Sequence, residues 1–135
     1  MPLIVHTARL DYRGPDRFDV TRAGGGDAGH PFAPSWPLVR EGKRLRDEAG
    51  DDMAKLDAAW SWYPPRYLDE MRASYRRHRS AWDALLGRDI VTAVCFCTDA
   101  ARCHRRLLAG ILAKLGAVDD GERVAAVEQL SIGGL

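Results

Sequence analysis

One stretch of the chain constrains its fold more than any other: residues 90–97 read Ile-Val-Thr-Ala-Val-Cys-Phe-Cys. A continuous run of apolar and β-branched residues predicts a strand that is buried on both faces of a sheet, as strands in parallel sheets are. The run is far shorter than the ~20 residues that a membrane-spanning helix needs. It therefore predicts a core strand, and we expect no membrane partner.

Local signals mark the other elements. Strands are predicted at residues 3–5 and 18–21. Helices are predicted where a capping residue or a proline precedes a pattern of helical period: one near residue 37 after the cap Ser35, a short one over 51–60, a long one from Pro64 to Leu86, and one over 100–115. Residues 124–130 are expected to add a last strand or helix, and residues 131–135 a frayed tail.

The order strand, helices, strand, helix predicts a small three-layer α/β domain with a mainly parallel sheet covered by helices. The 135 residues suit a single domain, here 1–135. Residues 23–30 include a G-x-G-x-x-G pattern, but Pro31 and Pro34 oppose the helix that a phosphate-binding fingerprint requires directly after it. This segment is therefore predicted to be a flexible glycine loop.

The long predicted helix has two different faces. One face carries a stripe of large side chains at helical spacing, which predicts burial and makes His78 a core histidine: Tyr67, Met71, Tyr75, His78, Trp82 and Leu85. The opposite face carries Arg72, Arg76, Arg77 and Arg79. Two interpretations of that basic face stay open, a solvated surface and an interface for nucleic acid or a protein partner.

Charge and cysteine usage narrow the class of protein. The formal net charge is +1, so any attraction for an anionic partner must come from a local patch. The N-terminus lacks the pattern of a secretory signal, which predicts a cytoplasmic protein with reduced thiols. Three cysteines lie within nine positions, which is not a disulfide framework. The three cysteines therefore either form a local site or belong to the core. The sequence does not indicate the oligomeric state.

The segment from Cys95 to Arg105 is the densest cluster of reactive side chains in the chain. It covers the carboxyl end of the core strand and the start of the next helix, where open α/β sheets bind ligands. We therefore predict a crevice in which Cys97, Cys103 and His104 supply thiol or acid-base chemistry. Arg105, expected to be partly exposed, would bind the phosphate or carboxylate of a small molecule, a nucleotide or a nucleic-acid end.

A zinc site is the alternative for the same cluster. Zinc favours four cysteine or histidine ligands, and the candidate set is Cys95, Cys97, Cys103 and His104. Their spacing matches none of the standard zinc-finger patterns, so the cofactor and the enzymatic status stay open.

Four ordered segments resemble a known family, the domain of unknown function family 488, which includes the YeaO-like proteins. The resemblance spans about residues 32–115 and is carried by Phe32–Leu38, Arg66–Met71, Val91–Cys95 and Cys103–Leu108. It implies a small cytoplasmic α/β domain of bacteria or phages whose biochemical activity is undefined. It also implies that further motif positions surround the same crevice as Cys103, His104 and Arg105: Arg22 in the segment Phe18–Arg22, Ser35, Arg66, Tyr67 and Glu70.

Overall fold

The computed structural model describes residues 1–97 and 102–123, and it contains a four-stranded sheet. The strands are β1 (Ile4–Arg9), β2 (Arg17–Asp19), β3 (Ile90–Cys95) and β4 (Val118–Glu122), in the order β2-β3-β1-β4. Every pair is parallel. The predicted α/β domain with a parallel sheet is therefore confirmed, although β4 was not predicted because its sequence, Val-Asp-Asp-Gly-Glu, has no apolar pattern.

Strand β3 occupies the interior of the sheet, as its apolar run predicts. It pairs with β1 from Ile4 beside Ile90 to Arg9 beside Cys95, and with β2 on its other side. Residues 91–95 are all buried. Strand β3 is buried along its length because a strand pairs with each of its edges and other parts of the chain pack on both faces of the sheet.

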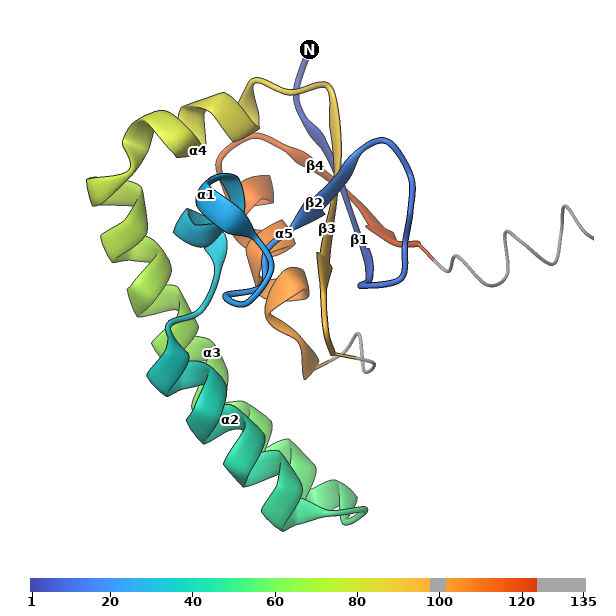
Figure 1. Cartoon of the computed structure of the whole chain (residues 1–135), viewed down its shortest axis with the longest axis vertical. Coiled ribbons are helices and arrows are strands. Elements are labelled where there is room, and N and C mark those ends of the chain that lie inside the picture. The colour runs from blue at the N-terminus through green and yellow to red at the C-terminus, as the bar shows by residue number, and fades with distance from the viewer. Residues whose placement is uncertain (98–101, 124–135) are drawn as a thin grey trace, which may run out of the picture.

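The helices are α1 (Gly26–Gly29), the 3₁₀ turn η1 (His30–Phe32), α2 (Trp36–Ala49), α3 (Met53–Arg77), α4 (Arg79–Leu86) and α5 (His104–Lys114). Helix α5 packs on the sheet and α3 packs against α5. Figure 1 shows α2 and α3 as a long antiparallel hairpin beside the sheet. Ser35 caps α2 as predicted, since its side chain accepts a hydrogen bond from the backbone N–H of Leu38.

The predicted boundary between the helices at 51–60 and 64–86 is wrong. Helix α3 runs through Pro64 and Pro65 without a break, although a proline in a helix interior removes a backbone hydrogen bond. Tyr67 and Met71, which follow the prolines, are buried in the core, and this packing outweighs the local preference. The chain breaks instead at His78, which is exposed and not a core histidine.

The glycine segment 23–30, predicted to be a loop, contains the short helix α1 and the first residue of η1. Gly29 lies against β2, because a Cβ there would come within 2.0 Å of the Asp19 carbonyl oxygen. Only glycine permits this close approach. The two prolines do not oppose the turn, since Pro31 occupies the first turn of η1, where a missing N–H costs nothing.

The remaining members of the predicted stripe on α3 and α4 are buried or half-buried, as expected. Trp82 is fully buried and meets the ring of Phe32 edge-on, with 4.8 Å between centroids. The expected element at 124–130, the tail at 131–135 and the predicted helix start at residue 100 lie outside the described residues. In the described part of the chain, every helix is too short or too polar to cross a membrane.

Ser74 joins three elements of this core, which gives a first prediction. Its hydroxyl donates to the carbonyl of Pro31 in η1 and accepts from Nε1 of Trp82 in α4 at 3.1 Å. Ser74→Ala leaves both groups without this partner, so we expect a loss of about 1–3 kcal/mol in the free energy of unfolding, measured by urea denaturation. Ser80→Ala, at an exposed position of α4, is the control and should change it little; equal losses would contradict the bridging role.

Candidate functional site

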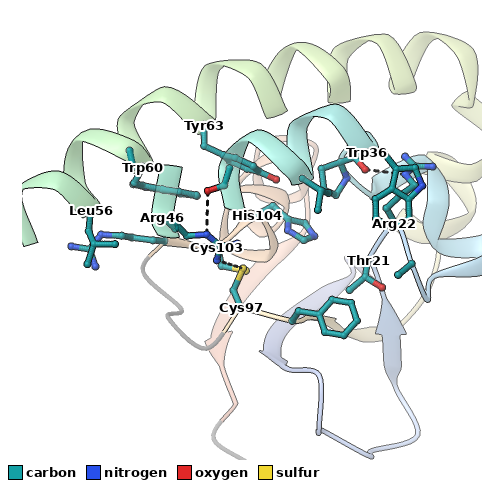
Figure 2. Close-up of a pocket in the computed structure, with 17 residues that line it drawn as sticks. Thr21, Arg22, Trp36, Arg46, Leu56, Trp60, Tyr63, Cys97, Cys103 and His104 are labelled. Carbon is teal, nitrogen blue, oxygen red and sulfur yellow. Dashed lines mark hydrogen bonds between the residues drawn. The ribbon is translucent and has the colours of Figure 1, made fainter. Parts of the chain in front are cut away.

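A pocket lies at the carboxyl ends of β2 and β3, between the α2–α3 hairpin and the start of α5. Figure 2 shows Cys97, Cys103 and His104 on one side of it and the side chains of the hairpin on the other. Its described lining residues are Thr21, Arg22, Ala23, Pro34, Trp36, Val39, Gly42, Arg46, Leu56, Ala59, Trp60, Tyr63, Phe96, Cys97, Arg102, Cys103 and His104. The crevice predicted at the end of the core strand therefore exists, and it contains the three predicted catalytic residues.

Arg105 lies beneath this pocket and not in it. The expectation of a partly exposed anchor is wrong, because its side chain is 0% exposed. Its Nη2 donates to Oε2 of Glu122 at 2.7 Å, and its Nε donates to Oε1 at 3.1 Å. Burial opposes the charge of Arg105, but the hydrogen bonds with Glu122 and the nearby cysteines outweigh it and raise the pKa. The guanidinium therefore stays charged inside the domain.

The same guanidinium organises the cysteines. Its Nη1 donates to the sulfur of Cys95 at 3.1 Å, to the sulfur of Cys103 at 3.2 Å and to the carbonyl of Cys97 at 2.7 Å. Cys95 and Cys103 are buried and Cys97 is half-buried, and both Cys97 and Cys103 line the pocket. One cation thus fixes the positions of all three cysteines.

Cys97 is the one cysteine of the cluster whose pKa is lowered. Hydrogen bonds with Cys103 and then with Cys95 lower its pKa far below that of a free thiol, and Arg46 and His104 add to the effect. Nη1 of Arg46 donates to its sulfur at 3.7 Å, a contact that Figure 2 marks. Burial and the neighbouring sulfurs raise the pKa of Cys103, which stays protonated. Among the described residues of the pocket wall, Cys97 is therefore the thiol whose environment favours the ionised form.

His104 is the first residue of α5 and is buried. Its Nε2 lies 3.1 Å from the carbonyl oxygen of Val20. Because a carbonyl only accepts, this hydrogen bond assigns the ring proton to Nε2. Burial lowers the pKa of the ring, so His104 is neutral at pH 7 and Nδ1 carries a lone pair.

The geometry also bears on the zinc alternative. Ligand atoms of Cys95, Cys103 and His104 lie within 4.8 Å of one another, whereas Cys97 is not part of that group. Arg105 already donates to both sulfurs, so a divalent cation bound to them would face a guanidinium about 3 Å away from its ligands. The donor set therefore fits a cysteine–arginine network better than a metal centre.

Three arginines line the pocket and come from three different segments. Arg46 projects from α2, and Arg102, which precedes α5, pairs with Asp57. Arg22 follows β2 and donates to the carbonyls of His30, Ala33 and Pro34. Arg22 therefore also holds η1 against the end of β2. The described part of the lining contains no aspartate or glutamate.

The other residues that the resemblance selects lie outside the described pocket lining. Glu70 accepts from the backbone N–H of Ser35 at 2.7 Å and from its hydroxyl at 2.5 Å, which ties α3 to the start of α2. Tyr67 is fully buried and donates to the carbonyl of Phe32 at 2.8 Å. Arg66 is exposed and lies over the ring of Trp62 at 4.4 Å. These residues position elements around the pocket, and a direct ligand contact by any of them stays a prediction.

The basic face of α3 and α4 is partly neutralised by its own helices. Arg72 pairs with Asp69, and Arg79 pairs with Asp83 and lies 4.5 Å over the ring of Tyr75. This arrangement is that of a solvated helix face, and it gives the interface hypothesis no specific support.

Sequence reasoning missed the residues that the helical hairpin contributes. Arg46, Trp60 and Tyr63 reach the pocket only because α2 and α3 fold back beside α5. No local motif marks Arg46. Trp60, Tyr63 and Tyr67 do follow helical spacing, and this aromatic series was the available signal.

The burial of Arg105 leads to a stability prediction. Arg105→Ala removes the partner of Glu122 and of two sulfurs, so we expect a loss of about 2–3 kcal/mol in the free energy of unfolding. This expected loss is smaller than the loss for a fully buried ion pair because the Glu122 side chain is 22% exposed. Arg106→Ala is the matched control: its pair with Asp119 is half-exposed, and we expect a loss of less than about 1 kcal/mol. Urea denaturation measures both, and losses of equal size would show that Arg105 does not organise the core.

The state of Cys97 leads to a labelling prediction. Iodoacetamide should modify Cys97 in the folded protein much faster than Cys95 or Cys103, as read by tandem mass spectrometry. A free thiol has a pKa near 8.5, so its rate rises about tenfold from pH 6 to pH 7. The pKa of Cys97 is already below this window, so its rate should stay nearly constant. A tenfold rise, or equal labelling of the buried cysteines, would contradict the thiolate assignment.

No curated protein and no solved structure matches the chain significantly. Residues 11–116 match the family DUF488-N3a, described as the active DUF488-N3 subclade. The match confirms the resemblance and extends it toward the N-terminus, where it includes Arg22. The chain belongs to the DUF488 family.

Proposed function

We propose that this protein binds a small anionic molecule in the pocket and that the Cys97 thiolate attacks it as a nucleophile. The observation that carries the proposal is the contact between Cys97 and Arg46 on the pocket wall, with 3.7 Å between Sγ and Nη1. An accessible thiolate next to a cation is the environment in which cysteines are reactive, whereas buried structural cysteines are inert. The family description as an active subclade agrees with a chemical role.

The charge of the lining favours an anionic ligand. Arg22 and Arg46 contribute two positive charges to a pocket whose described lining has no carboxylate, whereas the charge of the third lining arginine, Arg102, is paired with Asp57. The whole chain carries a formal charge of only +1, so this concentration of positive charge is local. Arginine is also suited to phosphate and carboxylate groups, because its planar fork matches their geometry.

The proposed chemistry is a displacement at an electrophilic carbon of the ligand. The Cys97 sulfur donates an electron pair to that carbon, an S–C bond forms, and the leaving group departs with the electrons of its own bond. Water then adds to the same carbon, the S–C bond breaks, and its electrons return to the Cys97 thiolate. The neutral His104 has a lone pair on Nδ1, so it can accept the proton that the water loses.

This proposal is tested by protection of Cys97. Ribose 5-phosphate and inorganic phosphate serve as anionic probes, and the rate of alkylation of Cys97 by iodoacetamide is the measured quantity. We expect either probe to slow the alkylation severalfold in the wild type, because the bound anion covers the sulfur and competes for the positive charge around it.

Arg46→Ala should lose most of this protection, because it removes the cation beside the sulfur. Arg44→Ala is the matched control: Arg44 is an exposed arginine of the same helix, it pairs with Glu41 and Glu48, and it lies outside the pocket lining. It should retain the protection. Alkylation that is indifferent to both anions in the wild type would overturn the proposed function.

A further inference from the structure

A column of aromatic rings runs along α3 from the pocket into the core. Trp60 stacks on Tyr63 with 5.3 Å between ring centroids, and Tyr63 stacks on Tyr67 with 6.0 Å. Both pairs have an interplanar angle of 15°, so the three rings are nearly parallel. The column continues to the ring of His104, whose centroid lies 5.6 Å from that of Tyr67. The Trp60 and Tyr63 end of this column lines the pocket.

The inner part of the column is fixed by the core. Tyr67 is fully buried, and its hydroxyl is held by the carbonyl of Phe32. The interior end of the stack therefore cannot rotate without breaking this hydrogen bond. Trp60 is only half-buried, and its ring belongs to the pocket wall. A ring that is held in place at the edge of a cavity is preorganised to receive another flat ring.

Two further aromatic side chains lie at the same pocket. Trp36 comes from the start of α2 and Phe96 from the end of β3, and they are 44% and 62% exposed. Large apolar side chains that remain exposed beside a cavity mark a surface that a ligand or partner covers. The pocket thus combines aromatic walls from three segments with the arginines already described.

We propose that the ligand of this pocket carries a planar heteroaromatic ring joined to its anionic group, as a nucleoside monophosphate does, and that the ring stacks on Trp60, the outermost ring of the column. This inference rests on the proposed function and names the class of its substrate. The arginines take the phosphate, and the aromatic walls take the base. Base–aromatic stacking tolerates any base, because every base has a π-face.

The first test compares two ligands on the wild-type protein by isothermal titration calorimetry. A nucleoside 5′-monophosphate and ribose 5-phosphate share the sugar and the phosphate and differ in the ring. We expect the nucleotide to bind about tenfold or more tightly, the effect typical of stacking one base. Equal affinity for the two ligands would overturn the inference, and this comparison requires no variant.

The second test locates the ring. Trp60→Leu keeps an apolar side chain but removes the aromatic face, and it should abolish most of the preference for the nucleotide over ribose 5-phosphate. Trp62→Leu is the matched control, since Trp62 is two residues away on α3, lies under Arg66 and is outside the pocket lining. It should leave the preference unchanged. A preference that survives Trp60→Leu, or that both variants lose equally, would overturn the stacking site.

The two proposals fail in different ways. If ribose 5-phosphate and the nucleotide protect Cys97 equally, the anion site is supported and the inference of a stacked ring is wrong. When neither ligand binds or protects Cys97, the proposed function itself is wrong. A free nucleotide and the end of a nucleic-acid strand both carry a base joined to a phosphate. Binding of a short single-stranded oligonucleotide with a 5′-phosphate distinguishes them. Tighter binding of the mononucleotide identifies a free nucleotide as the ligand, and tighter binding of the oligonucleotide identifies a strand end.

Discussion

The ion pair between Arg105 and Glu122 is the interaction on which the rest of the site depends. Arg105 belongs to α5, Glu122 to β4, and the cysteines that Arg105 contacts come from the end of β3 and the start of α5. A guanidinium without partners would be very costly in this interior. Five donor contacts to a carboxylate, two sulfurs and a carbonyl satisfy it. The charge therefore joins three elements of the fold at one point.

This buried charge also contributes to the lowered pKa of the half-buried Cys97. Arg105 donates to the sulfurs of Cys95 and Cys103, and this contact polarises their S–H groups. These two cysteines in turn hydrogen-bond with Cys97 and lower its pKa, the contribution of Cys103 being the larger. The positive charge acts at the pocket through the thiols, while the arginine itself stays out of reach of a ligand.

Local sequence signals predicted the parts of the structure that local chemistry decides. The apolar run at 90–97 predicted the central strand and, through it, a crevice beside Cys97, Cys103 and His104. The cap at Ser35 predicted the start of α2. The burial of Arg105 could not be predicted, because its partner Glu122 lies on a strand without an apolar pattern. The contact of Arg46 with Cys97 could not be predicted either, because the two residues are 51 positions apart in the sequence. The continuity of α3 could not be predicted because packing outweighs the local effect of two prolines.

The pocket is built from two structural units with separate tasks. The sheet and α5 supply the sulfur, the imidazole and the buried cation behind them. The α2–α3 hairpin supplies Arg46, Trp60 and Tyr63, and it is attached to η1 by the Tyr67–Phe32 and Ser74–Pro31 bonds. Because the lowered pKa of Cys97 depends chiefly on hydrogen bonds within the first unit, substitutions in the hairpin can change the pocket wall with little effect on that pKa. Arg46 connects the two tasks, since it lies on the hairpin and contacts the sulfur. An anion bound as proposed would therefore compete with the Cys97 sulfur for this one guanidinium.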